Sequence, residues 1–401
     1  MNISIPGILF STAFTLLINS TNGYAQKGLP PDDKFTATVN TSYPSHIDFN
    51  EKLVSQLTVP AGFKVSIAAT GLGKPRIMAV GADGSLYITR RDVGDVLLLS
   101  NKNANGRFET LKKVWAQFPD VHGITIHDGY LYLASSKSLK RGKIKADGMV
   151  QDTVTLINDL PDGGQHDNRM IAFGKDGKLY MTVGSDCNDC AETNKELATM
   201  LVMDADGKNR KIFARGLRNT IGFDWQPQTG EIWGCDNGTD WRGDEIPPEE
   251  LNKIVKDGDY GWPLVFGKQV VDPTREDPAG TTKALYAKST IPAVMTFSAH
   301  SAPIDFRFMN AANIPAEYRN DALVAWHGSW NRKNPEGYKV QRIHYVNGQP
   351  TSVQDFFSGF LSKDLKSRFG RPAGILVAQN GNVYISDDEN GVIYSITANS
   401  K

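Results

Sequence analysis

The sequence has no excess of charge of either sign and no long apolar run. Its 401 residues include 44 Lys plus Arg and 44 Asp plus Glu, so the formal charges cancel. That balance gives no support for binding to nucleic acid or to a charged membrane surface. A mostly apolar run from Ile5 to Leu17 is too short for a comfortable membrane span. We therefore expect no nucleic-acid partner and no stable membrane insertion.

Cysteine is scarce, with only Cys187, Cys190 and Cys235 in the chain. The first two form a C-x-x-C motif, but Ala191 follows it where covalent haem attachment needs histidine. Too few other cysteines or histidines lie nearby for a zinc site. In an oxidising compartment the simplest interpretation is a structural disulfide between Cys187 and Cys190, with Cys235 either free or competing as a partner.

The N-terminal segment has the pattern of an export signal, although no Lys or Arg precedes its apolar run. That run is followed by polar residues and by the small-residue site Gly23-Tyr24-Ala25. We expect a signal peptide over residues 1–25, an extended lead-in over 26–49 and one catalytic domain over 50–401. This predicts a periplasmic or secreted protein.

One pattern recurs six times: a short apolar strand, a tight turn and a second apolar strand. The copies begin at Arg76, His122, Asn168, Arg218, Ala302 and Arg371. In four copies the turn is Asp-Gly or Asn-Gly, the strongest short-range hairpin signal. The first three copies are spaced by roughly 45 residues, a period typical of four-stranded propeller blades. The sequence therefore predicts an all-β fold, a six-bladed β-propeller with four-stranded antiparallel blades.

The expected blade boundaries follow from these hairpins. In chain order the blades cover Val54–Phe108, Glu109–Thr155, a blade from Ile157, a blade from Lys211, Ile291–Val346 and Phe356–Ile396. A strand from one terminus commonly closes a propeller, and Phe63–Ala69 is the expected strand. The clearest helical segment is Ala191–Met200. We also expect a long polar insertion in the fourth blade, over residues 236–282.

Cationic residues stand just ahead of the first strand in several repeats. They are Arg76, His122, His166 with Arg169, Arg218 with Asn219, and Arg371. Equivalent positions of propeller blades converge at one end of the central channel. Because the chain has no net charge, we expect this ring to recognise an anion through local placement.

The expected insertion combines many carboxylates with glycines (CDNGTDWRGDEIPPEELNKIVKDGDYGWP). Carboxylates and exposed carbonyls are the ligands that calcium prefers, but the spacing does not match the EF-hand loop. On these residues alone, a solvated acidic loop explains the composition better than a calcium site.

Three stretches together resemble a known family. They are GGQHDNRMIAFGKDGKLYMTVGS, the run ARGLRNTIGFDW…DNGTDWRGDEI…GDYGWP, and GRPAGILVAQNGNVYISDD. From about Val54 to Ile396 the chain resembles the soluble pyrroloquinoline quinone (PQQ)-dependent sugar dehydrogenases, in particular their aldose and sorbosone dehydrogenase-like branch. The family's fold is a six-bladed propeller, in agreement with the repeat count. The resemblance implies oxidation of an aldose or related sugar by hydride transfer to PQQ, with calcium as second cofactor and an external electron acceptor.

The resemblance also implies roles for individual residues. His166 matches the family's general base, and an imidazole suits this role because its ordinary pKa is near neutrality. Arg218 and Asn219 match a pair that contacts the quinone oxygens, where Arg218 would stabilise negative charge on the reduced quinone. The positions matched to the PQQ carboxylates are Arg332, Arg368 and Arg371. Those matched to calcium are the carbonyls of Gly238 and Thr239 and, for additional structural calcium, Asp244, Glu245 and Tyr260.

Two other functions remain open. A calcium-dependent lactonase on a six-bladed propeller would hold one metal with Glu, Asn and Asp side chains at the channel mouth, where this sequence has Arg and His. A non-catalytic propeller that binds a carbohydrate or a partner would keep the same residues unused. His122 stands where the glucose-oxidising branch has glutamine and could line the substrate mouth. Because substrate specificity lies in loops, the sequence does not identify the sugar.

Overall fold

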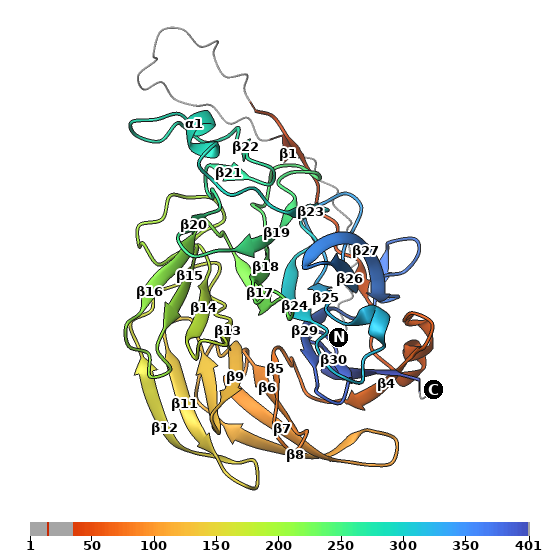
Figure 1. Cartoon of the computed structure of the whole chain (residues 1–401). Helices are drawn as coiled ribbons and strands as arrows, with labels where there is room; N and C mark the ends of the chain where they lie inside the picture. The colour runs from red at the N-terminus through yellow and green to blue at the C-terminus, as the bar shows by residue number, and fades with distance from the viewer. Residues whose placement is uncertain (1–13, 16–34, 400–401) are drawn as a thin grey trace, which may run out of the picture.

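Six four-stranded antiparallel sheets are arranged around a central axis as the blades of a propeller (Figure 1). The computed structural model describes residues 14–15 and 35–399. The first three blades are β5–β8 (Met78–Val80, Leu86–Arg90, Asp95–Lys102, Phe108–Trp115), β9–β12 (Gly123–His127, Tyr130–Ala134, Leu139–Ile144, Val150–Ile157) and β13–β16 (Ile171–Phe173, Leu179–Val183, Thr199–Met203, Lys211–Arg215). The predicted fold class is confirmed.

The other three blades complete the ring. They are β17–β19 with β23 (Thr220–Trp225, Ile232–Asp236, Glu249–Ile254, Met295–Phe297), β24–β27 (Pro303–Phe308, Ala322–Trp326, Lys339–Val346, Gln349–Phe357) and β29–β31 with β4 (Pro372–Val377, Val383–Asp387, Val392–Ala398, Phe63–Ala69). One short strand, β20 (Gly258–Asp259), extends the third blade by pairing in parallel with β16.

The ring is closed by strands from the two ends of the chain. Strand β4 pairs antiparallel with β31, with Phe63 opposite Ala398 and Ala69 opposite Ile393. The sixth blade therefore contains an early segment and the last described strand, and the prediction for Phe63–Ala69 is confirmed. Closure removes the free edge that an open row of sheets would leave for aggregation.

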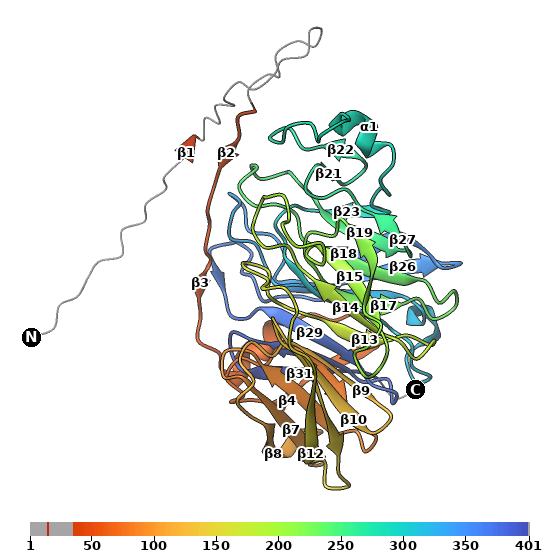
Figure 2. The same cartoon turned by 90° about the vertical axis from the view of Figure 1, so that its left-hand side faces the viewer.

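The segment ahead of β4 runs along one side of the propeller (Figure 2). Strand β2 (Thr38–Val39) pairs with β1 (Phe14–Thr15), and β3 (Ser45–His46) pairs in parallel with β28 (Ser367–Arg368). The expected signal peptide over residues 1–25 lies outside the described residues, apart from the two residues of β1.

Most of the expected blade boundaries are wrong by about one strand. The structure places β8 in the first blade, β16 in the third and β23 in the fourth, whereas we expected each of them to lie in, or to begin, the following blade. Strand β27, whose end we expected in the sixth blade, completes the fifth. These outer strands are largely exposed, as β8 and β27 show. Their sequence therefore indicates a strand without indicating the sheet that it joins.

The helix expected at Ala191–Met200 does not form, and that expectation is wrong. Leu197 and Met200 are buried, and Thr199–Met203 is the third strand of its blade. Burial between neighbouring sheets overrides the helix propensity of this stretch. The acidic segment Glu249–Ile254 is likewise a buried inner strand, so the excursion from the fourth blade lies between β19 and β23.

That excursion carries the small elements grouped near the top of Figure 1. They are β21 (Val265–Phe266), β22 (Val270–Val271) and α1 (Lys283–Ala287). Two short 3-10 helices lie elsewhere, at Glu51–Gln56 and Ala316–Tyr318. Among the residues that the structure describes, no helix is long and apolar enough to cross a membrane.

Packing is tightest along the inner strands. The second strands β14, β18, β25 and β30 are buried over their whole length because each blade lies between two neighbours. The first strands also approach one another closely. A Cβ at Gly222 would stand 2.2 Å from the backbone nitrogen of Phe306, and one at Gly374 would stand 2.2 Å from the carbonyl oxygen of Arg76. Glycine is therefore required where neighbouring blades meet.

Replacing Gly222 with alanine is expected to lower the free energy of unfolding by about 1–3 kcal/mol, because an added methyl group has no space against a neighbouring backbone. Gly81→Ala is the matched control, since its nearest atoms are the side-chain ends of Ser85 and Asp83, which can move. Denaturant titration of both variants measures the difference. Equal free energies of unfolding for the two variants would show that neighbouring blades can move apart at Gly222 without loss of stability.

Candidate active site

The ring residues lie at one end of the channel because of the hairpin geometry. In an antiparallel pair, the start of the first strand lies beside the end of the second. In the fourth blade, the backbone N–H groups of Arg218 and Asn219 donate to Asp236, both at 2.9 Å. In the sixth, the N–H of Arg371 donates to Asp387 at 3.1 Å. In these two blades the start of the first strand and the end of the second therefore lie together at this end.

His166 is held by the loop that precedes the third blade. The buried Arg169 guanidinium donates to the carbonyls of His166 and Pro161, both at 2.9 Å. A Cβ at Gly184 would stand 2.6 Å from the Cβ of His166 and 3.0 Å from Oδ1 of Asn219. Gly184 therefore lets the strand end, His166 and Asn219 come together. Arg169, part of the expected cationic ring, supports the loop instead of facing a ligand.

The imidazole of His166 is neutral at physiological pH. Burial, and then the neighbouring Arg218, lower its pKa to about 3. Its Nδ1 lies 2.7 Å from Oγ and 3.1 Å from the carbonyl oxygen of Ser185. Within residues 35–399 no hydrogen bond reaches Nε2, so this nitrogen is free to accept a proton.

Arg218 is a buried cation whose hydrogen bonds go to neutral oxygens. The side chain is 3% exposed, and it donates to the backbone carbonyls of Asn188 and Asn237 and to Oδ1 of Asn188. The nearest paired carboxylate, that of Asp240, is 4.0 Å away. Burial lowers the pKa of Arg218 but does not discharge it, because arginine titrates far above neutral pH.

Arg371 is arranged in the same way two blades further on. Its Nε donates to the carbonyl of His327 at 2.9 Å, and its Nη2 donates to that of Gly328 at 3.1 Å. In the described part of the chain it has no ion pair within 4.0 Å. Arg218, whose nearest ion-pair partner is 4.0 Å away, and Arg371, which has no such partner within 4.0 Å in residues 35–399, therefore keep positive charge at the same end of the propeller.

The other two arginines that we expected at the PQQ carboxylates, Arg368 and Arg332, are held by groups of the chain itself. Arg368 forms a two-point ion pair with Glu389, with Nε 3.1 Å from Oε2, and also donates to the carbonyl of Pro44. The guanidinium of Arg332 pairs with Glu245 at 3.2 Å and also donates to the carbonyls of Asp244 and Ala299 at 2.8 and 2.9 Å. Each of these arginines, which we expected to bind the PQQ carboxylates, already has a carboxylate partner in the chain.

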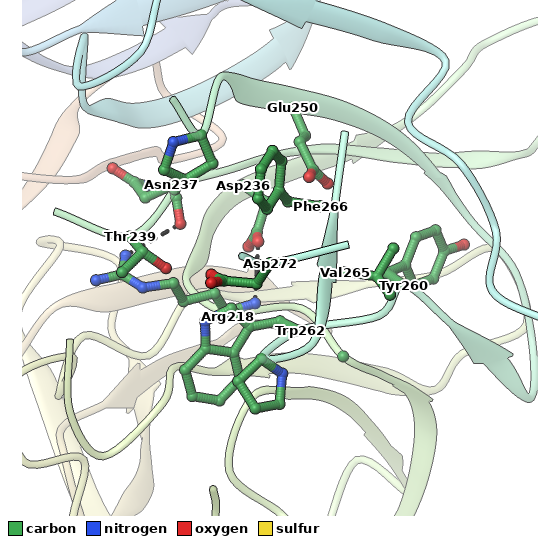
Figure 3. Close-up of a pocket in the computed structure, with 14 residues that line it drawn as sticks. Arg218, Asp236, Asn237, Thr239, Glu250, Tyr260, Trp262, Val265, Phe266 and Asp272 are labelled. Atoms are coloured by element: carbon green, nitrogen blue, oxygen red, sulfur yellow. Dashed lines mark hydrogen bonds between the residues drawn. The ribbon is translucent and has the colours of Figure 1, made fainter. Parts of the chain in front are cut away.

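The expected calcium ligands separate into two groups. Gly238 and Thr239 carry carbonyl oxygens that accept no hydrogen bond among the described residues. Together with Tyr260 they line a small cavity of about 20 Å³ (Figure 3). Asp244 instead accepts from Asn40, and the 81% exposed side chain of Glu245 pairs with Arg332. The structure does not bring Asp244 and Glu245 to Tyr260.

Three carboxylates that the sequence analysis did not select line the same cavity. They are Asp236, Glu250 and Asp272, all buried, and burial raises the pKa of Asp236 to about 6 and that of Glu250 to about 7. Their proximity depends on the strands β18 and β19 and on the excursion that follows them, which the composition did not reveal. No group of three or more His, Cys, Asp or Glu side chains with metal-holding geometry occurs within the described ranges.

A second polar cluster joins blades one, five and six. His327 Nε2 lies 2.8 Å from Oδ1 of Asp388, which also pairs with Arg76. Burial and Arg371 lower the pKa of His327 to about 4. His327 and Asp388 directly follow the second strands of their blades, β25 and β30. Because the end of a second strand lies beside the start of the first, this position in the hairpin could have predicted them. His122 is completely buried, which excludes the expected place at a substrate mouth.

The cysteines behave as the simplest interpretation predicts. Cys187 and Cys190 form a disulfide, with Cα atoms 6.0 Å apart, and Cys235 is free and buried. Burial raises the pKa of the Cys235 thiol, so it is unreactive.

Comparison with known proteins shows which family the chain belongs to. The TrAA12-like family matches residues 57–256 and 262–399. A Borreliella burgdorferi protein whose name states no activity is 32% identical over 365 residues, covering 86% of this chain and 92% of that protein. A Coprinopsis cinerea protein named pyrroloquinoline quinone-dependent pyranose dehydrogenase is 26% identical, covering 85% of this chain and 54% of that protein.

Solved structures show the same fold. The holo form of the Coprinopsis cinerea pyranose dehydrogenase PQQ domain superposes with a TM-score of 0.73 at 21% identity, covering 89% of this chain and 100% of that one. The calcium structure of a Trichoderma reesei enzyme of carbohydrate-active family AA12 gives 0.74 at 20% identity, covering 86% and 97%. On the match over most of its length, the chain belongs to the TrAA12-like family.

Proposed function

We propose that this protein is a PQQ-dependent dehydrogenase that oxidises an aldose or related sugar at C1. One observation carries the proposal: the neutral His166 lies beside Arg218, and the hydrogen bonds of the Arg218 and Arg371 guanidinium groups go to neutral oxygens, with no carboxylate oxygen closer than 4.0 Å in the described chain. PQQ has three carboxylates, and cations whose hydrogen bonds go only to carbonyls suit such an anion. Relatives named as PQQ-dependent pyranose and sugar dehydrogenases support the same assignment.

The chain's own residues divide the chemistry among them. Bound PQQ would supply the hydride acceptor, and an external acceptor would then remove the electrons. Nε2 of His166 would take the proton of the sugar hydroxyl, because the ring is neutral and this nitrogen has no hydrogen-bond partner in the described chain. The fixed charge of Arg218 would stabilise negative charge on the oxygens of bound cofactor. Asn219, which lies beside His166, would contact the same oxygens.

Calcium fits the oxygen donors that this end of the fourth blade presents. The carbonyls of Gly238 and Thr239 are without hydrogen-bond donors in the described residues, and calcium prefers such oxygens. They lie on the loop that follows Asn237, whose own carbonyl accepts from Arg218. An ion here would sit next to the proposed PQQ pocket and polarise the cofactor. The threonine side chain at position 239 does not affect this role, because the calcium ligand would be the backbone carbonyl.

The two alternative functions are weaker. A lactonase needs a metal held by several acidic and amide side chains at the channel mouth, and the corresponding positions hold His166, Arg218 and Arg371. A binding propeller needs no neutral base beside a buried cation. Both alternatives predict that the protein does not bind PQQ.

Arg371→Ala is expected to weaken PQQ affinity by at least about 2 kcal/mol, roughly thirtyfold, because it removes a half-buried charge that faces the anion. Arg371→Lys should recover only part of the loss, since an ammonium lacks the planar fork. Arg368→Ala is the matched control and should lose less, because Glu389 already pairs with that cation. Titration of apoprotein with PQQ, with and without calcium, measures all three.

Calcium removal by a chelator is expected to abolish activity that excess PQQ alone does not restore. If Arg371→Ala binds PQQ as wild type does, the assignment of this residue is wrong. If wild type binds no PQQ in the presence of calcium, the dehydrogenase proposal fails.

His166→Gln is expected to leave PQQ binding largely intact and to lower kcat by about 10²- to 10⁴-fold, the usual contribution of a general base. His46→Gln, at an exposed position on the lead-in segment, is the control. Sugar-dependent reduction of an artificial electron acceptor gives the rates. An unchanged kcat for His166→Gln removes this residue from the mechanism.

We also propose that the protein is exported, on the basis of the apolar run Ile5 to Leu17 and the small-residue site ending at Ala25. The mature chain is expected to begin near Gln26 and to fractionate outside the cytoplasm. N-terminal sequencing of protein from the native host tests this. An intact Met1 would contradict cleavage.

A further inference from the structure

The disulfide loop lies between the two groups that the proposed mechanism uses. It covers residues 187–190, shortly after β14 ends at Val183. Ser185, just ahead of it, is completely buried, and its N–H donates to the carbonyl of Arg218 at 2.8 Å. The side chain of Ser185 reaches His166, and Asn188 in the loop reaches Arg218. One short segment therefore contacts both the proposed base and the proposed cation.

The contacts of Ser185 decide which nitrogen of His166 carries the proton. The carbonyl oxygen of Ser185, 3.1 Å from Nδ1, can only accept a hydrogen bond. The hydroxyl of Ser185 donates its single proton to the carbonyl of Cys187 at 2.9 Å, so its oxygen accepts from Nδ1 at 2.7 Å. Both partners require a proton on Nδ1 of the neutral ring. Nε2 is then left with the lone pair that a base needs.

The contacts of Asn188 fix the Arg218 guanidinium. Its backbone carbonyl accepts from Nε at 3.0 Å, and its Oδ1 accepts from Nη2 at 2.9 Å. The amide is held in this orientation by Asp240, whose N–H donates to Oδ1 at 2.8 Å. All the acceptors that Asn188 offers Arg218 are neutral, so they hold the cation in place without cancelling its charge.

The loop itself is anchored at several points. The disulfide joins its first and last residues, and Asp189 pairs with Arg242 and, at 3.0 Å, with Arg275. Both cysteines are half-buried, as is Asn188. A closed loop with these anchors gives the Cys187 carbonyl and the Asn188 side chain little freedom to move.

From these contacts we infer that the Cys187–Cys190 loop is a positioning element of the site: it holds His166 in the tautomer with a free Nε2, and it holds the Arg218 guanidinium through neutral acceptors. Ser185 and Asn188 are its positioning residues. The effect on turnover rests on the proposed function, whereas the effect on the tautomer does not.

The first test measures the tautomer in apoprotein and needs no PQQ. Nitrogen–proton correlation NMR of isotope-labelled histidine, with the His166 signals identified from His166→Gln, distinguishes the two protonation sites. Wild type is expected to show the proton on Nδ1 alone. Ser185→Ala and the double variant Cys187→Ser/Cys190→Ser are expected to show a measurable share of the other tautomer, because each weakens the chain of hydrogen bonds from Nδ1 to the Cys187 carbonyl.

The second test measures turnover of the holoenzyme loaded with PQQ and calcium. Ser185→Ala and the double cysteine variant are expected to lower kcat about tenfold to a hundredfold with little change in KM, the size of effect that misplacing a catalytic group produces. Asn188→Ala should lower kcat as well, through Arg218. Asp186→Asn is the matched control and should behave as wild type, because this exposed side chain forms no hydrogen bond within the described part of the chain.

Each outcome decides the inference. A double cysteine variant that keeps the wild-type tautomer and kcat overturns it. Should that variant fail to fold, Ser185→Ala retains the disulfide and decides by the same two measurements. If wild type binds no PQQ, the proposed function fails, and the tautomer of the apoprotein variants still supports or overturns the role of the loop.

Discussion

The pairing of β4 with β31 is the interaction on which the rest of the structure depends. His166 belongs to the third blade, Arg218 to the fourth and Arg371 to the sixth. No two of these residues are brought together by a single sheet. Packing of neighbouring blades brings His166 and Arg218 together, and closure of the ring by an antiparallel pair between an early strand and the last described one fixes the sixth blade, with Arg371, in the same ring. Close approach of the first strands, as at Gly222 and Phe306, holds neighbouring blades against one another.

Neutral hydrogen-bond partners give the site its electrostatic character. A buried guanidinium is usually paired with a carboxylate, which cancels its charge. Arg218 and Arg371 are instead satisfied mainly by carbonyl and amide oxygens, which meet their hydrogen-bonding needs and leave the charge in place. Burial and then the charge of Arg218 lower the pKa of His166 and keep its imidazole unprotonated. The proposed anion recognition and the neutral base thus both depend on the charge of Arg218.

Local signals explain what the sequence made predictable. The Asp-Gly and Asn-Gly turns act over a few residues, so the hairpins, their number and the cationic positions ahead of them could be predicted. Strand Phe63–Ala69 could be placed because a propeller must close. The proximity of His166, Arg218 and Asn219 followed from their equivalent positions in neighbouring blades.

Contacts between distant parts of the chain explain the features that the sequence did not predict. In the sequence, Arg332 and Arg368 look like cations that are free to bind an anion. In the structure they pair with the carboxylates of Glu245 and Glu389, and a linear pattern does not reveal such pairs. The outer strands were placed in the wrong blades for the same reason, since their exposed sequences fit either neighbour. Thr199–Met203 shows the third case, where tertiary burial overrides a local preference for helix.

The closing pair also constrains the order in which the chain can fold. Register partners Phe63 and Ala398 are separated by more than three hundred positions, so their contact is among the least local in the molecule. Non-local pairing is slow, because the entropy of closing so long a loop is lost before the contact forms. During synthesis the first five blades can form while β4 is still unpaired. The sixth blade can assemble only after β31 has been synthesised. Until then the chain carries an unpaired edge, so completion of the ring is the step at which aggregation and productive folding compete.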